Sequence, residues 1–323
     1  MSARTRAATA TVAALVGLGL VASGCIPFSP LKGGTSCNIT PANAFWRGTA
    51  SDLPVDPNST SIVNSIGAGS HLHADFGSGL YQGEPIGIPY NVVPGTQAKV
   101  KVTFSEPGES DPGPYPVPAD ALIEGGPSST GDRHVIVVDG DNCKLYEMGD
   151  AYPNPDGSWN AYSGAVWDMT SNAMRPDTWT SSDAAGLPIL PGLVRYDEVH
   201  AGAVDHVIRM TIPSTAAAYL WPASHQAPHG SGGPPMGTRI RLKSTADLSQ
   251  VDPSVLPIAK ALQTYGAIVA DNGSAWYISG EPDSRWNNDA LATLGTIHGS
   301  DFEVVVEAGQ KVAANSYQAK NAQ

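Results

Sequence analysis

The chain has 323 residues, of which 30 are acidic and 18 are basic, so its formal net charge is −12. An acidic body of this kind is repelled by nucleic acid and by anionic lipid surfaces, which argues against both as partners. Glycine (35 residues) and proline (27 residues) are abundant and charged residues make up only 15%, a composition typical of many short strands joined by turns.

The first 24 residues have the pattern of an export signal. Arg4 and Arg6 precede an apolar run over residues 7–21, which is too short for a membrane-spanning helix. The run ends in VASGC, which resembles a bacterial lipobox, so we predict that residues 1–24 are removed and that Cys25 is lipidated. A secretory signal cut nearby is the alternative. The remaining chain, with 16 basic and 30 acidic residues, would carry a charge near −14.

Export would place the other two cysteines in an oxidising environment, on the outer face of the cell membrane or in the medium. Cys37 and Cys143 are then predicted to form a disulfide, which closes a loop of roughly 100 residues and stabilises the fold by about 4 kcal/mol. A two-cysteine metal site is the alternative, but neither cysteine has a CxxC partner or a close histidine. Residues 25–45, which begin with a Pro-, Gly- and Ser-rich segment, are predicted to be a tether from the lipid anchor.

Residues 46–310 are predicted to form one mainly β domain, a β-sandwich or jelly-roll-like fold with one or two short helices, followed by a C-terminal tail over residues 311–323. Short runs of β-branched and aromatic residues, bounded by Gly, Pro, Asn and Asp, mark the strands. In chain order the predicted strands cover residues 99–104, 134–139, 144–148, 161–169, 204–212, 217–221, 238–243, 267–270, 275–279 and 302–307. The proline-rich residues 106–127 are predicted to cross the surface as a loop.

Turn and capping residues add two hairpins and two helices. The DGDN turn at residues 139–142 and the DNGS turn at residues 271–274 each join two consecutive predicted strands, since Asn-Gly and Asp-Gly favour tight reversals. A helix is predicted over residues 253–265, with Asp252 as its N-cap. A shorter helix is predicted over residues 288–294.

Residues 186–212 bring ionisable groups closest to apolar ones. In the predicted strand at its end, His206 shares a face with aliphatic residues, while Arg209 points to the other side. His206 is therefore a candidate general acid or base beside Asp197 or Glu198. The alternative is a core histidine that is hydrogen-bonded to one of these carboxylates or to the backbone.

Glycoside hydrolysis needs two carboxyl groups facing each other across a sugar, roughly 5–10 Å apart. Glu147 shares a strand face with Leu145, which is unusual for an acid unless it lines a groove or pairs with a cation. Asp168 ends a strand rich in aromatic residues. No nucleophile elbow, phosphate loop or dinucleotide fingerprint is present in the sequence. The candidate catalytic residues are Glu147, Asp168, Asp197, Glu198 and His206.

His71, His73 and Asp75 alternate in the segment HLHADFGSG, so in an extended conformation all three point the same way. Imidazole and carboxylate are common metal ligands, and another histidine could complete the set. One hypothesis is therefore a divalent metal at His71, His73 and Asp75. Exposed histidines in a glycine-bounded loop, with Asp75 capping a turn, are the alternative. No other cofactor is expected.

Tryptophan and tyrosine gather after residue 145, and exposed rings of this kind stack on sugars. Most of these rings are expected to be core residues. Trp179 and Trp286 lie in the polar segments RPDTWTSSD and PDSRWNND, which predicts that both are exposed. With Tyr196 they are the candidate ligand-binding aromatics.

The phrases GLPILPGLVRYDEV, PPMGTRIRLK and AKALQTYGAIVADNGSAWYISG, in this order, resemble a family of exported bacterial (lipo)proteins with no assigned activity. The phrases HLHADFGSG and GDRHVIVVDGDNCKLYEM look like the same family, so the resemblance covers nearly the whole mature chain. Similar phrases occur in exported bacterial proteins associated with carbohydrate modules. The resemblance therefore implies a glycan partner.

Two functions are consistent with these observations. The first is a lipid-anchored cell-surface protein that binds, and in one version hydrolyses, a carbohydrate or cell-wall glycan in a groove lined by carboxylates and aromatics. The second is a non-catalytic envelope lipoprotein whose polar clusters are structural. The membrane would be contacted through the lipid anchor alone.

Overall fold

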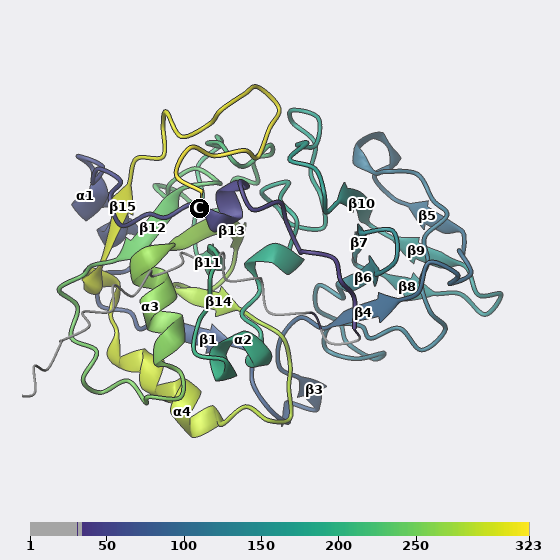
Figure 1. The fold of residues 1–323 in the computed structure, drawn as a ribbon, viewed down its shortest axis with the longest axis horizontal. Coiled ribbons are helices and arrows are strands. Elements are labelled where there is room, and N and C mark those ends of the chain that lie inside the picture. Colours follow the sequence, from purple (N-terminus) through teal and green to yellow (C-terminus); the bar gives the residue numbers. More distant parts are fainter. Residues whose placement is uncertain (1–30, 32–33, 323) are drawn as a thin grey trace, which may run out of the picture.

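The structure is a computed structural model that describes residue 31 and residues 34–322. Among the described residues, strands make up 27% and helices 15%, and the strands form several open sheets (Figure 1). The prediction of a mainly β domain is confirmed, whereas the finer β-sandwich or jelly-roll arrangement stays a prediction. The predicted export signal and Cys25 lie outside the described residues.

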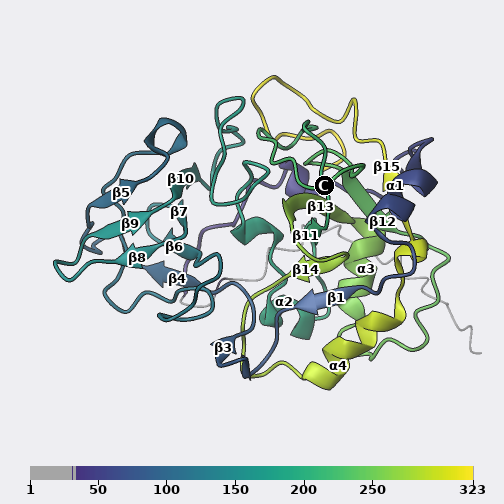
Figure 2. The ribbon, with the colours of Figure 1, turned by 180° about the vertical axis from the view of Figure 1, so that it is seen from behind.

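Six strands form the largest sheet, which occupies one end of the molecule in Figures 1 and 2. β1 runs parallel to β14 and β11 runs parallel to β13, while the other neighbours are antiparallel. The sheet is therefore mixed. From edge to edge its strands are β1 (His73–Asp75), β14 (Tyr277–Ser279), β11 (Ile208–Ile212), β13 (Ala267–Asn272), β12 (Arg239–Leu242) and β15 (Phe302–Val305).

A four-stranded sheet lies at the other end of the molecule and is buried on both faces (Figures 1 and 2). Ile136 and Val138 belong to an apolar core that is shared with the six-stranded sheet, whereas Val135 and Val137 belong to a second core. The second core is shared with a three-stranded sheet. The four-stranded sheet consists of β10 (Ser163–Asp168), β7 (Lys144–Gly149), β6 (Val135–Asp139) and β4 (Tyr90–Val93). The three-stranded sheet consists of β5 (Val102–Phe104), β9 (Trp159–Ala161) and β8 (Tyr152–Pro153).

The helices are short and pack at the borders of the sheets. α1 (Ser59–Ile66) packs on β15, and α3 (Leu256–Thr264) packs on β12 through its apolar side. The other elements are the hairpin of β2 (Leu80–Tyr81) and β3 (Glu84–Pro85), the helices α2 (Tyr196–His200) and α4 (Asn288–Ala292), and the 3₁₀ turns Phe45–Arg47, Pro107–Glu109, Leu190–Gly192, Thr293–Thr296 and Gly299–Asp301.

Both predicted helices exist, but the first begins three residues later than expected. Val255 is its N-cap, and the Asp252 carboxylate instead accepts hydrogen bonds from the Ser254 backbone N–H and hydroxyl at 2.8 and 2.7 Å. The second helix is capped as a short polar side chain predicts, because Asn287 accepts from the N–H groups of two residues in its first turn.

The hairpin at residues 139–142 is confirmed, since β6 and β7 pair antiparallel across it. The prediction of a hairpin at residues 271–274 is wrong, because β11 lies between β13 and β14 in the sheet. The Gly273 N–H donates to Ile212 O at 2.9 Å, so this turn crosses the end of β11 before the chain returns. Residues 217–221 form only an isolated bridge at Tyr219 instead of the predicted strand. Prolines flank this segment, and a proline cannot donate to a ladder.

The predicted disulfide between Cys37 and Cys143 is confirmed, with 5.4 Å between the two Cα atoms. It joins the N-terminal arm to the turn before β7. Around it, segments expected to be a tether and a tail are packed into the fold: the Phe45 N–H donates to Tyr317 O at 2.7 Å, and both rings are buried. Among the described residues, no helix is long and apolar enough to cross a membrane.

Candidate functional site

One side of the six-stranded sheet is polar. Residues paired across neighbouring strands point to the same side of a sheet. The register pairs Asp75 with Ser279 and pairs both His73 and Thr211 with Tyr277. The other side of the same strands carries apolar residues such as Ile278 and Met210, which are fully buried. The polar face consists of His73, Asp75, Arg209, Thr211, Asp271, Tyr277 and Ser279.

Arg209 is the central cation of the polar face and is buried. Its Nη1 donates to Ser279 Oγ at 2.8 Å. Its Nε and Nη2 donate to the two carboxylate oxygens of Asp183 at 3.2 and 2.9 Å, which is the bidentate geometry that a guanidinium favours. Nη2 also lies 2.9 Å from Asp271 Oδ2. Burial raises the pKa of Asp183 to about 6 and raises the pKa of Asp271, although Arg209 favours both ionised forms.

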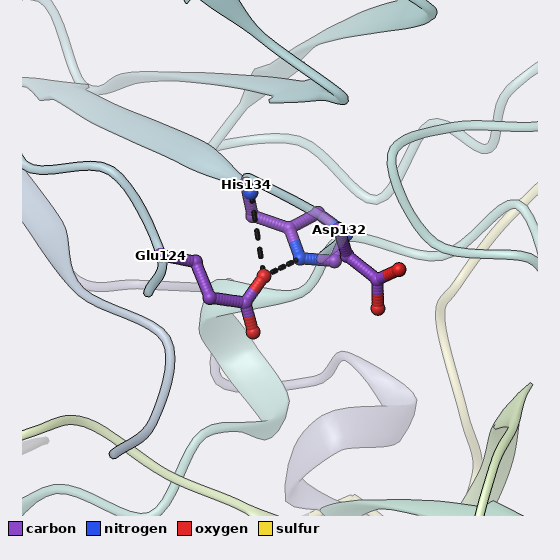
Figure 3. A group of neighbouring side chains, drawn as sticks. All are labelled: Glu124, Asp132 and His134. Carbon is purple, nitrogen blue, oxygen red and sulfur yellow. Dashed lines mark hydrogen bonds and ion pairs between the residues drawn. The ribbon is translucent and has the colours of Figure 1, made fainter. Parts of the chain in front are cut away.

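A second cation, His134, acts through its charge on Asp183 and Asp271. His134 lies just before β6, with Nδ1 2.5 Å from Glu124 Oε2 and Nε2 2.9 Å from Ser182 O (Figure 3). Burial by itself would lower the pKa of His134, but the charge and hydrogen bond of Glu124 outweigh burial and raise it to about 9. Burial would likewise raise the pKa of Glu124, but His134 outweighs it and the pKa is lowered. At neutral pH the pair is an imidazolium and a carboxylate.

Asp132 completes a tight group with this pair. Among the described residues, Glu124, Asp132 and His134 are the only ones that bring three ligand-type atoms within 4.8 Å of one another. In Figure 3 the Glu124 carboxylate is turned toward the His134 ring, and Asp132 lies beside the pair. Both nitrogens of the protonated ring face oxygen acceptors, so neither offers a lone pair to a metal. The ion pair therefore accounts for this group.

Asp75 lies on the polar face opposite Ser279, and the charges of Glu124 and Asp132 act on it. Its side chain is exposed, yet the surrounding protein displaces enough water to raise its pKa. His73 and Arg209 oppose this shift, whereas the charges of Glu124 and Asp132 add to it. Carboxylates thus outnumber the two cations Arg209 and His134. The carboxylates concerned are Asp75, Glu124, Asp132, Asp183 and Asp271.

A hollow of about 940 Å³ opens beside the edge strand β1. The His73 and Tyr277 rings lie against each other, with 4.1 Å between their centroids. Tyr81, on the β2–β3 hairpin, is 68% exposed. The hollow thus combines a carboxylate with two tyrosines and histidines. Its wall consists of residues 69–76, Tyr81, Ile86, Ala275, Tyr277, Asn288, Leu291, Ala292 and Gly295.

The alternation predicted for His71, His73 and Asp75 agrees with the structure, in which all three side chains are exposed and Leu72 between them is buried. Their ligand atoms are not among those that converge within 4.8 Å in the described chain. His71 Nδ1 is 2.6 Å from Gly295 O, and the His73 ring lies on Tyr277. The metal therefore stays a prediction, and in this conformation the histidines are turned to other partners.

His206 lies in a closed polar knot of Arg195, Glu198 and His206, whose side chains are at most 3% exposed. Glu198 Oε1 is 3.0 Å from His206 Nε2 and accepts from the Arg195 N–H at 2.8 Å, and Oε2 pairs with the Arg195 guanidinium. His206 Nδ1 is 2.8 Å from Val207 O. This is the structural alternative stated for His206. The knot holds the N-terminus of α2 against the segment just before β11.

Glu147 neither lines a groove nor pairs with a cation through a direct contact. It is fully buried on the side of β7 that faces the six-stranded sheet, and its carboxylate accepts from the backbone N–H groups of Ile189 and Leu190 at 2.9–3.0 Å. Burial raises its pKa to about 7, although these two hydrogen bonds favour the charged form. Glu147 thus fastens the four-stranded sheet to the segment that leads to the other sheet.

The remaining predicted carboxylates lie apart from the hollow and form surface ion pairs. Asp168 Oδ2 is 2.7 Å from Lys144 Nζ, and hydrogen bonds from Lys144 and Thr170 lower its pKa to about 2. Asp197 Oδ1 is 2.8 Å from Arg285 Nη1. Neither carboxylate is part of the polar face.

The predicted aromatics do not form one binding surface. Trp286 is 5% exposed, so the prediction of an exposed ring is wrong: its Nε1 donates to Glu281 O at 3.0 Å, and the ring packs on Phe76 and Tyr196. Tyr196 is half-buried beneath Arg285. Trp179 is half-buried near Arg175.

Sequence reasoning missed the residues that the structure gathers around Arg209. The predicted strand alternation placed Arg209 on the side opposite His206, and this was the one feature of the sequence that pointed to Arg209. Glu124 lies in a segment expected to be a surface loop, and nothing in the sequence places it beside His134 or Asp75. No family model, curated protein or solved structure matches the chain, so the family resemblance adds no function to this site.

Proposed function

We propose that this protein binds a carbohydrate in the hollow beside β1. The volume of about 940 Å³ is within the roughly 300–1,000 Å³ of small-ligand sites. The observation that carries the proposal is that the exposed ring of Tyr81, the half-exposed ring of Tyr277 and the carboxylate of Asp75 line the same hollow. Sugars present apolar C–H faces to rings and hydroxyl groups to carboxylates, so one ligand satisfies both.

The site would lie outside the cell, on a protein anchored through a lipid at Cys25. The disulfide between Cys37 and Cys143 supports this location, because such bonds persist in oxidising compartments. Replacing Cys25 with Ser should move the chain from the membrane fraction to the soluble fraction and abolish labelling by a radioactive fatty acid. Unchanged fractionation and labelling would contradict the anchor.

Binding is tested on an array of cell-wall and plant polysaccharides, followed by calorimetry with the best ligand. Tyr81→Ala and Tyr277→Ala should each weaken binding by about 2- to 13-fold, which corresponds to the roughly 0.5–1.5 kcal/mol of an aromatic ring contact. Tyr162→Ala is the matched control, because Tyr162 is also exposed but lies outside the hollow. Absence of binding to every polysaccharide, or equal binding by all three variants, would contradict the proposal.

The second candidate is a non-catalytic envelope lipoprotein. It is favoured by the burial of Glu147, Glu198 and His206, since all three have structural partners and none lines the hollow. Under this alternative the polysaccharide array stays blank, and loss of these side chains affects stability alone.

A further inference from the structure

The β2–β3 hairpin, which brings Tyr81 to the wall of the hollow, has little support of its own. Among the described strands, its two members pair only with each other. A two-stranded hairpin is marginally stable in water, and Pro85, which lies opposite Leu80, has no N–H group to donate across the pair. Leu80 and Tyr81 are 66% and 68% exposed, so burial contributes little to holding them. The order of this hairpin therefore depends on its contacts with the rest of the chain.

The side chain of Asn288, at the start of α4, supplies such a contact. Its Oδ1 accepts from the Ser78 N–H at 2.9 Å, and its Nδ2 donates to Ser78 O at 2.9 Å. The amide thus bonds both backbone groups of one residue, as a neighbouring strand does. The Ser78 hydroxyl lies 3.2 Å from the same Oδ1. Tyr81 follows Ser78 by three residues, and both Tyr81 and Asn288 line the hollow.

The backbone at Gly77 admits this amide because it carries no side chain. A Cβ atom on Gly77 would lie 2.6 Å from Asn288 Oδ1, so any larger residue there would displace the amide. Two other hydrogen bonds join residues 77–86 to the rest of the described chain. The Asp283 N–H donates to Gly77 O at 3.2 Å, and the Ser129 hydroxyl lies 3.4 Å from Glu84 Oε2. The two bonds of Asn288 to the Ser78 backbone are shorter than either and lie closest to the base of the hairpin.

We propose that Asn288 is a positioning residue of the carbohydrate site: its bonds to Ser78 latch the β2–β3 hairpin to α4 and so hold the Tyr81 ring against the hollow. This inference rests on the proposed carbohydrate binding. With the latch in place, a sugar meets a ring that is already oriented for stacking. Without it, the hairpin takes up many orientations, and ordering it again costs free energy that is then lost from binding.

Hydrogen exchange at the backbone amides of residues 79–86 tests the latch without any ligand. Asn288→Ala should speed this exchange by about 10-fold or more, while exchange in β6 and β7 stays unchanged. Gly77→Ala should act in the same way, because its methyl group displaces the Asn288 amide. Asn154→Ala is the matched control: the Asn154 amide also joins polar groups at a turn, 3.0 Å from Ser158 Oγ, but lies outside the hollow. Unchanged exchange in Asn288→Ala would overturn the latch.

Calorimetry with linear oligosaccharides of glucose, xylose and mannose tests the positioning of Tyr81. Asn288→Ala should weaken binding about as much as Tyr81→Ala does, but by less than about 2-fold in a chain that already carries Tyr81→Ala. Asn288→Asp keeps the acceptor for the Ser78 N–H and should retain part of the affinity.

Independent, additive losses in the two single variants would overturn the positioning role, because a residue that serves only the fold acts whether or not the Tyr81 ring is present. Absence of binding to every sugar would remove the proposed carbohydrate function, and the exchange rates would then decide the latch by themselves.

Discussion

The polar knot and the polar face contain the same kinds of ionisable side chain but differ in the number of carboxylates for each cation. In the knot, one carboxylate of Glu198 contacts Arg195 and His206, and all three side chains are almost completely buried. On and beside the polar face, the cations Arg209 and His134 are outnumbered by the five carboxylates of Asp75, Glu124, Asp132, Asp183 and Asp271, and Asp75 lines the hollow. A balanced cluster stabilises the fold and has nothing left to offer a ligand. An unbalanced cluster holds protons or charge that a ligand can use.

The largest effect is expected in the knot. Glu198→Ala leaves Arg195 and His206 buried beside a cavity and should lower the free energy of unfolding by about 3–5 kcal/mol. Its neighbour supplies the control, because Asp197 forms a surface pair and Asp197→Ala should cost less than about 1 kcal/mol. Urea unfolding followed by tryptophan fluorescence measures both. Similar losses in the two variants would remove the distinction between a closed knot and a surface pair.

The second prediction concerns Glu147, a buried carboxylate whose direct partners are backbone N–H groups. Its folded pKa of about 7 lies above the ordinary 4.5, so between these pH values the native chain keeps a proton that the unfolded chain loses. The contribution of this group to stability therefore falls as pH rises from 4.5 to 7, by up to about 3 kcal/mol.

Glu147→Gln should remove that dependence, so the variant gains on the unaltered chain as pH rises. Unfolding free energies of both chains at pH 5 and pH 8 give the comparison, in which the contributions of Asp183 and His134 largely cancel. Parallel curves for the two chains would contradict a raised pKa. Glu147→Leu is the companion variant: it leaves two buried N–H groups without acceptors and should be destabilised at both pH values.

The smallest stability effect, with the opposite sign, is expected on the polar face. Asp75→Asn removes one negative charge from a cluster with excess carboxylates and should stabilise the fold at pH 7 by a few tenths of a kcal/mol, because solvent screens an exposed group. Thermal unfolding at low ionic strength measures the change, and added salt should reduce it. Marked destabilisation would mean that Asp75 serves the fold rather than the hollow.

Local patterns predicted the elements but not their neighbours. Val135–Asp139 and Lys144–Gly149 form the predicted hairpin because a short turn fixes the register of adjacent strands. The turn at residues 271–274 contains an equally good signal, yet β11 enters between its two strands. Pairing between distant strands depends on which apolar faces can be buried together, and no window of local sequence holds that information.

The same contrast between local pattern and distant contact holds for the residues of the site. The predicted strand over residues 204–212 begins only at Ile208, so His206 lies before β11 and its side is not set by alternation along that strand. Alternation did place His71, His73 and Asp75 on one exposed side, with Leu72 buried between the two histidines. The choice of His206 followed from its apolar neighbours, which are the surroundings of a core residue. β11 itself contains the cation that gathers Asp183, Asp271 and Ser279.

By itself the sequence determined the mainly β composition, the acidic charge, the disulfide between Cys37 and Cys143 and the alternation of exposed and buried side chains at residues 71–73. These properties depend on residue type and on spacing along the chain. Only the tertiary structure decided that β1 joins β14, that Glu124 pairs with His134, and that a hollow opens beside Asp75. These depend on contacts between segments far apart in the chain, where packing of whole sheets outweighs local preference.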